Sequence, residues 1–214
     1  MKQFPKVVIL AQGGTHGDFL HRCCKVMIEG TLPNVKPSGK IGEISGFKRY
    51  NYESYHAGQK KNIEYTGNEE FVVGHIWHEE YLDWPSKFYF IDFLDEHIDT
   101  IIQMLLEKQY DNDMDALMKP IIDKLPVDLA KKINRENYEQ TLITSYKTSR
   151  RKFALQTNAT RILMTDLYEF NKVVDIMKHM EIYNSSYQNI LKEFHTNWVN
   201  NNGKFIKILT SKAK

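Results

Sequence analysis

The sequence has little cysteine and no long apolar run, and each shortage narrows what the protein can be. Its 214 residues include two cysteines, Cys23 and Cys24, which are neighbours and cannot join distant segments by a disulfide. No four-cysteine metal centre is available either. No apolar run approaches the roughly 18 residues that cross a membrane. We therefore expect free thiols, a reducing compartment and no membrane span.

A strong net charge of either sign is also missing. The chain carries 29 Lys and Arg against 27 Asp and Glu, a formal net charge of +2. This balance gives no reason to expect a nucleic-acid or membrane partner. Only about six apolar residues precede the first glycines, too few for the core of a signal peptide. The expected location is the cytosol, of the cell that makes the protein or of an infected host.

What the chain does contain is an alternation of short apolar runs and amphipathic stretches. Apolar runs typical of buried strands cover 6–11, 69–77, 87–94 and 160–165. Apolar residues at helical spacing cover 18–29, 96–109, 135–155, the stretch after Asp166, and 187–198. This alternation predicts an α/β fold, a three-layer sandwich with a mostly parallel sheet of four or five strands and helices on both faces. The length and the lack of repeats predict a single domain over 1–214.

Other stretches are less regular. Residues 31–68 have no sustained period, which predicts a long loop, and a loop of this length is a candidate for a lid beside a binding site. One or two short helices are expected to break near Pro120 and Pro126. Asp166 resembles the start of a capping box. The final "NNNGKFIKILTSKAK" is expected to form a small edge strand and a basic tail.

Residues 13–17, Gly-Gly-Thr-His-Gly, fill the turn between the first predicted strand and the first predicted helix. Glycines allow positive φ and let backbone N–H groups point inward, while the first helical turn leaves free N–H donors. Ligands of parallel sheets bind outside the carboxyl ends of the strands. The turn is therefore predicted to hold a phosphate or a sulfate, with Thr15 adding a hydroxyl donor. The alternative is an ordinary turn in which Asp18 only caps the helix.

Two common nucleotide motifs are absent from this turn. No Gly-Lys-Ser/Thr closes it, which argues against a bound Mg-nucleoside triphosphate. Gly13, Gly14 and Gly17 miss the one-three-six spacing of the dinucleotide fingerprint.

The order of elements resembles that of the sulfotransferase family. "GGTHGDFL" resembles the loop with which that family holds the 5′-phosphosulfate of 3′-phosphoadenylyl sulfate. "VVGHIWHEEYLDWPSKFYFIDFLDEHIDTIIQMLL" resembles its strand ending in a histidine base, followed by the next strand and helix, and "TRILMTDLYEFNKVVDIMKHM" resembles its late strand and helix. The motifs are loose, although the match covers most of the chain. The resemblance implies a divergent member of the family with a P-loop-like fold. Such a protein would transfer the sulfuryl group of 3′-phosphoadenylyl sulfate to a hydroxyl of a small molecule or glycan and release 3′-phosphoadenosine 5′-phosphate.

The resemblance also implies roles for single residues. His75 is implied as the base that takes the proton of the acceptor hydroxyl. The donor is implied to bind at Gly13, Gly14, Thr15, His16, Gly17, Asp18, Phe19 and Thr100. The lysine usual in the family's loop is absent, and its 3′-phosphate arginine falls near the acidic Asp92. Arg150 and Arg151 are therefore the candidates for the 3′-phosphate.

Other interpretations stay open. The missing lysine and arginine favour a non-catalytic protein that keeps the fold and binds a nucleotide or a partner. A P-loop kinase-like phosphotransferase is disfavoured because Gly-Lys-Ser/Thr is missing. His75, His78, His16 and Asp18 are residue types that bind zinc, but residues three apart in a strand point to opposite faces, so we expect no metal.

Overall fold

The computed structural model describes residues 4–32, 56–57, 71–74, 83–123, 125–155 and 159–212. The strands are β1 (Val7–Ala11), β2 (His56–Ala57), β3 (Phe71–Gly74), β4 (Lys87–Asp92) and β5 (Ala159–Leu163). The helices are α1 (Gly17–Glu29), α2 (Ile98–Gln109), α3 (Met114–Ile122), α4 (Val127–Ala130), α5 (Tyr138–Leu155), α6 (Phe170–His179) and α7 (Gln188–Lys212). Short 3-10 helices at Asp95–His97, Arg135–Asn137, Met164–Tyr168 and Ser185–Tyr187 precede α2, α5, α6 and α7.

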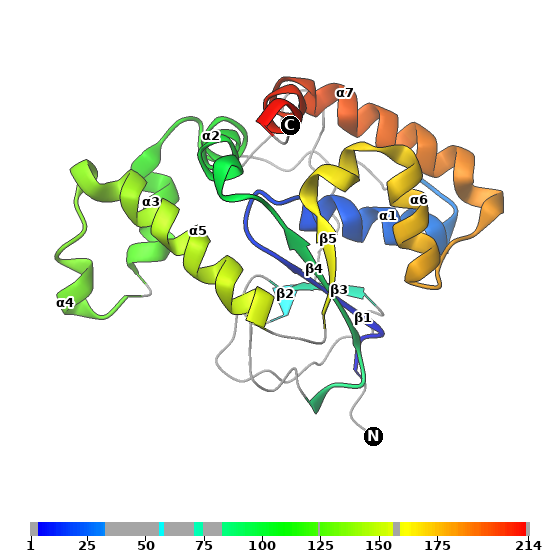
Figure 1. Cartoon of the computed structure of the whole chain (residues 1–214), viewed down its shortest axis with the longest axis horizontal. Coiled ribbons are helices and arrows are strands. Elements are labelled where there is room, and N and C mark those ends of the chain that lie inside the picture. The colour runs from blue at the N-terminus through cyan, green and yellow to red at the C-terminus, as the bar shows by residue number, and fades with distance from the viewer. Residues whose placement is uncertain are drawn as a thin grey trace.

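The strands form one parallel sheet in the order β2-β3-β1-β4-β5, with β1 in the centre (Figure 1). Val8 of β1 lies opposite Val72 of β3 and Phe88 of β4. All five residues of β1 are buried, as the continuous apolar run predicts for a strand covered on both faces. The predicted α/β class is confirmed, and the first predicted strand is the central one.

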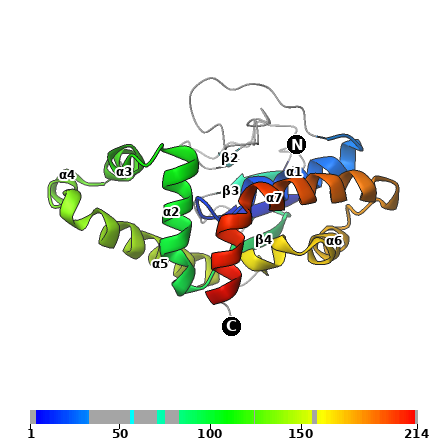
Figure 2. The same cartoon turned by 90° about the horizontal axis from the view of Figure 1, so that it is seen from above.

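The two faces of the sheet carry separate apolar clusters because successive side chains of a strand point in opposite directions. Ile9 and Ile91 share the larger cluster with side chains of α1, α6 and α7. Val8 and Phe90 share the smaller one with Phe153 of α5. Helices thus contact both faces, an arrangement compatible with a three-layer sandwich (Figure 2).

The first helix ends as its sequence suggests. Gly30 adopts a left-handed φ of 66°, and its N–H donates to the carbonyl of Val26. Cys23 and Cys24 are buried within α1 as free thiols. Burial raises the pKa of Cys24 to about 12, so this thiol stays protonated and unreactive.

The end of the chain differs from its prediction. Residues 200–212 continue α7 as far as Lys212, in place of an edge strand and a basic tail. Trp198, Phe205 and Leu209 are buried at helical spacing, and this apolar stripe carries the helix through Gly203. A Cβ at Gly203 would meet no atom within 4 Å, so the glycine serves no close packing there.

Two helix boundaries also need correction. Asp166 lies inside the 3-10 helix Met164–Tyr168 and does not cap α6, which begins at Phe170. The helix expected to break near Pro120 runs on to Ile122, whereas Pro126 does precede α4.

Most of the predicted loop at 31–68 lies outside the described residues, and the role of a lid lies there with it. The described part includes β2, which pairs with β3 at one edge of the sheet. None of the described helices is both long enough and apolar enough to cross a membrane.

Candidate functional site

The glycine turn, predicted at residues 13–17, covers residues 12–16 in the structure, because β1 ends at Ala11 and α1 begins at Gly17. From β1 the chain goes on to β2 at one edge of the sheet, whereas from β4 it goes on to β5 at the other edge. The connections therefore diverge between β1 and β4. Open parallel sheets bind their ligands at such a point, so the turn lies where a ligand is expected.

Two glycines of this region are required by close packing. Gly14 has a φ of 78°, and a Cβ on it would lie 2.9 Å from Cγ2 of Ile101 in α2. A Cβ on Gly17 would lie 3.1 Å from Cγ1 of Val73 in β3 and would also collide with Ala11. The turn thus packs closely against α2, and the start of α1 packs closely against the sheet. Gly13 and Gly14 nevertheless stay partly exposed.

Thr15 is fully buried and holds the turn from within. Its backbone N–H and its hydroxyl both donate to the carbonyl of Gln12, at 3.0 and 2.7 Å. In this structure the hydroxyl proton is used inside the turn, whereas the sequence predicts it as a donor to the ligand.

His16 follows with a left-handed φ of 67° and precedes the first residue of α1. Its Nε2 lies 3.0 Å from the hydroxyl oxygen of Tyr168, and its ring stands edge-on to Trp198 at 4.9 Å. Burial, together with the positive charge of Lys108, lowers the pKa of His16 to about 3. Burial also raises the pKa of Tyr168. A neutral imidazole and a protonated phenol therefore face each other at neutral pH.

The other flank of the turn is held by α5. The hydroxyl of Tyr146 donates to the carbonyl of Gly13 at 2.8 Å, and its ring packs against Phe93 at the end of β4. Burial raises the pKa of Tyr146, so this donor keeps its proton.

Two acceptor atoms near the turn are buried and, within the described part of the chain, have no hydrogen-bond partner. They are Oε1 of Gln12 and Oδ1 of Asp18. A buried acceptor without a donor is expected to meet a water or a ligand. The carboxylate of Asp18 also places negative charge beside a turn predicted to hold an anion.

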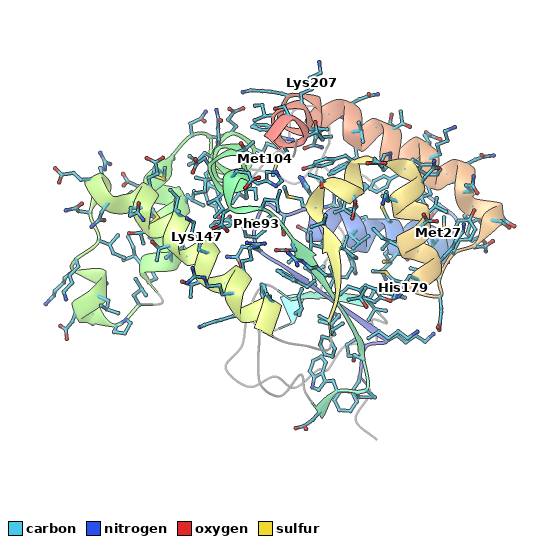
Figure 3. The ribbon with its side chains drawn as sticks, in the orientation of Figure 1. Met27, Phe93, Met104, Lys147, His179 and Lys207 are labelled. Carbon is cyan, nitrogen blue, oxygen red and sulfur yellow. The ribbon has the colours of Figure 1, made fainter. Side chains whose placement is uncertain are left out.

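A charged cluster lies at the end of the neighbouring strand β4. The side chain of Asp92 is 1% exposed; its Oδ1 accepts from Nε of Arg150 at 2.7 Å, and its Oδ2 accepts from Arg161 of β5. Arg150 also donates to Asp95 at 3.0 Å, and Lys147 lies 3.8 Å from the same carboxylate. Figure 3 labels Phe93 and Lys147 in this region, near the middle of the view. The cluster holds three cations against two carboxylates.

The remaining predicted residues fall in several places. Phe19 is buried and stacks on Trp198 at 3.7 Å, so its side chain belongs to the core. Thr100 is buried in the first turns of α2. Arg151 is exposed on α5 and, among the described contacts, does not join the cluster around Asp92. His75, the predicted base, lies outside the described residues, as does His78.

Arg161 is the residue that sequence reasoning missed. Arg161 is 69 positions from Asp92, and only its charge within the apolar "TRILMT" strand could have drawn attention to it. The described residues hold no group of three or more His, Cys, Asp or Glu that could bind a metal ion.

No protein-family model matches the chain, and neither a curated protein nor a solved structure matches it.

Proposed function

We propose that the chain is a sulfotransferase-like protein of P-loop-like fold that binds 3′-phosphoadenylyl sulfate at the glycine turn. One observation carries the proposal: the turn follows the central parallel strand at the point where the connections diverge, and it opens a helix of 13 residues. The first N–H groups of such a helix point at an anion and carry partial positive charge. Left-handed backbone at Gly14 and His16 supports a turn shaped for such contacts.

The arginines around Asp92 support a second phosphate position one strand away. A guanidinium has five N–H donors, and among the described residues the contacts to Asp92 and Asp95 use only some of those on Arg150 and Arg161. The side chain of Arg161 is 57% exposed and can reach a ligand. Asp92 orients both guanidinium groups, so we assign the 3′-phosphate to Arg150 and Arg161.

The described residues would contribute mainly by holding and orienting the donor. In the transfer, the oxygen of the acceptor hydroxyl forms a bond to sulfur while the bond from sulfur to the 5′-phosphate oxygen breaks. 3′-Phosphoadenosine 5′-phosphate leaves, and the hydroxyl proton passes to a base. The resemblance assigns that base to His75.

A second candidate is binding of the nucleotide without transfer. This candidate is favoured by the carboxylates of the site. Asp18 lies at the turn, and Asp92 and Asp95 already accept hydrogen bonds from several N–H groups of Arg150. Both candidates share the glycine turn and differ only in turnover.

The direct test is a titration with 3′-phosphoadenosine 5′-phosphate against adenosine 5′-phosphate. We expect the 3′-phosphate to strengthen binding by at least tenfold, and Arg161→Gln or Arg150→Gln to remove that preference. Arg151→Gln is the matched control, since it removes the same charge from the next residue of α5 and should leave the preference intact. If the unaltered protein binds both nucleotides with equal affinity, 3′-phosphoadenylyl sulfate is ruled out as the donor.

Turnover separates the two candidates. With an acceptor found by screening, we expect His75→Ala to lose sulfuryl transfer while it still binds 3′-phosphoadenosine 5′-phosphate, and His78→Ala to keep both. A protein that binds the nucleotide tightly and transfers to no acceptor is the binding protein of the second candidate.

A further inference from the structure

Lys108, on the last turn of α2, is a partly buried cation without a carboxylate partner in the part of the chain that the structure describes. Its Nζ donates to Oδ1 of Asn202 and lies 5.2 Å from the centre of the Phe205 ring. The neighbouring carboxylate of Glu107 pairs instead with Lys204, at 2.8 Å. An ammonium has three N–H donors, and Asn202 uses one of them.

Two routes connect Lys108 to the glycine turn. Through α2, Leu105 lies over Gly14, and Lys108 follows Leu105 by about one helical turn on the same side. Through α7, Asn202 bonds both Lys108 and the carbonyl of Trp198, whose ring stands against His16. In Figure 2, α2 lies beside the blue turn, and the red end of α7 lies next to α2.

The charge of Lys108 acts on the turn. It contributes to the lowered pKa of His16, and burial lowers the pKa of Lys108 itself to about 8, with Glu107 acting in the opposite direction. Within the described ranges, the charged and titratable groups around Lys108 are Glu107 on α2, Lys204 on α7 and the neutral His16 of the turn. Residues 12–17 contain no Lys or Arg. A cation kept partly buried at such a position favours a bound anion.

We propose that Lys108 supplies the positive charge of the anion pocket at the glycine turn, and that this pocket takes a phosphate or sulfate linked in a diphosphate-like group. The inference rests on the proposed function and names the residue on which its affinity depends. It also explains how a turn with Asp18 beside it and no lysine of its own can bind an anion.

The test compares Lys108→Met with Lys204→Met by calorimetric titration, using 3′-phosphoadenosine 5′-phosphate and inorganic pyrophosphate as probes. Lys204 is the matched control because it is a lysine over the same Phe205 ring, at 5.1 Å, but is paired with Glu107. We expect Lys108→Met to weaken both ligands at least tenfold and Lys204→Met to change them less than twofold.

A second variant gives a readout that a merely structural lysine would not move. The affinity of the unaltered protein for 3′-phosphoadenosine 5′-phosphate should fall as the pH rises through about 8, because Lys108 loses its proton there. Lys108→Arg stays charged and should keep binding without this alkaline fall. It also serves where Lys108→Met does not fold, since it conserves the charge and most of the side chain.

The outcomes separate the two proposals. If Lys108→Met folds and binds both probes as tightly as the unaltered protein, the role of Lys108 is overturned and the proposed function still stands. An alkaline fall of equal size in Lys108→Arg likewise overturns that role. If pyrophosphate binding depends on Lys108 but the 3′-phosphorylated nucleotide is not preferred, the role of Lys108 in anion binding is supported and 3′-phosphoadenylyl sulfate is rejected as the donor. Binding of neither probe rejects both.

Discussion

His16 is held between the hydroxyl of Tyr168 and the ring of Trp198, in a backbone conformation that few residues other than glycine adopt. Its neutrality has a consequence for the site. A neutral imidazole cannot balance the charge of a bound anion, so any compensation must come from backbone N–H groups or from cations on other elements. In the proposed site, the residues of the turn therefore fix its shape, and Lys108, Arg150 and Arg161 are the cations assigned to supply charge from outside it.

The lowered pKa of His16 predicts a loss of stability in acid. In the unfolded chain this histidine binds a proton near its ordinary pKa of 6.5, whereas in the folded protein it does so only near 3. Between these values the unfolded state binds more protons, so the free energy of unfolding falls as the pH falls, by up to about 1.4 kcal/mol for each pH unit. The expected stability is fully present above about pH 6.5.

His16→Asn tests this, because asparagine tolerates the left-handed conformation and does not titrate. Urea unfolding at pH 7 and at pH 4.5 should show a smaller acid loss in the variant than in the unaltered protein. Burial also lowers the pKa of His195, so the loss should shrink without disappearing. An identical loss in both proteins would show that His16 is accessible to protons when folded.

At the scale of elements, the proposed site uses the start of α1 and not its end. Gly14 and Gly30 both have positive φ, 78° and 66°, and both lie against side chains that a Cβ would displace. We expect Gly14→Ala and Gly30→Ala each to lower the free energy of unfolding by about 1–2 kcal/mol or more. Only Gly14→Ala should also weaken nucleotide binding, because it displaces the backbone that faces the ligand.

Titration of Gly14→Ala and Gly30→Ala with 3′-phosphoadenosine 5′-phosphate, under conditions where both variants are folded, measures whether only the first one loses affinity. Weakened binding in Gly30→Ala to the same extent would mean that lost stability, and not the geometry of the turn, controls affinity.

The last turns of α7 should contribute to the core. Leu209 is fully buried in the larger cluster, and Leu209→Ala is expected to cost about 2–5 kcal/mol. Lys207, labelled in Figure 3, is exposed on the same helix, and Lys207→Ala should change stability by less than about 0.5 kcal/mol. Chemical denaturation measures both, and a cost below about 1 kcal/mol for Leu209→Ala contradicts the packed end of α7.

Local pattern predicts elements better than it predicts their partners. The apolar run of β1 and the spacing in α1 locate both elements to within about one residue, and Gly30 marks the end of the helix. The continuation of α7 was missed because the asparagines before Gly203 suggest a break, while burial of Phe205 and Leu209 outweighs that local preference. The pairing of Asp92 with Arg161 depends on how strands lie side by side, which the residues near either one do not reveal.

At the scale of the whole molecule, positive and negative charges nearly balance, so binding of an anion must depend on where individual cations lie. The net charge is +2 over 214 residues, which is too small to attract a multiply charged nucleotide over a distance. The cations of the proposed site lie on α2, α5 and β5, and those of α5 and β5 meet at Asp92 at the carboxyl end of β4. Binding should therefore depend on the folded sheet as a whole and should stabilise it against unfolding.

This coupling predicts a thermal shift with a defined size and selectivity. A ligand that binds only the folded state adds about 2.7 kcal/mol of stability at one hundred times its dissociation constant. For a domain of this length each kcal/mol raises the melting temperature by about 2–4 °C, so 3′-phosphoadenosine 5′-phosphate should raise it by about 5–11 °C. ATP and NAD at the same concentration should raise it less, because neither carries a 3′-phosphate for Arg150 and Arg161. Arg161→Gln should reduce the shift given by 3′-phosphoadenosine 5′-phosphate toward that of ATP, whereas Arg151→Gln should preserve it. A shift that is larger with ATP than with the 3′-phosphorylated nucleotide would move the phosphotransferase ahead of the sulfotransferase, because the site would then recognise a triphosphate and not a 3′-phosphate.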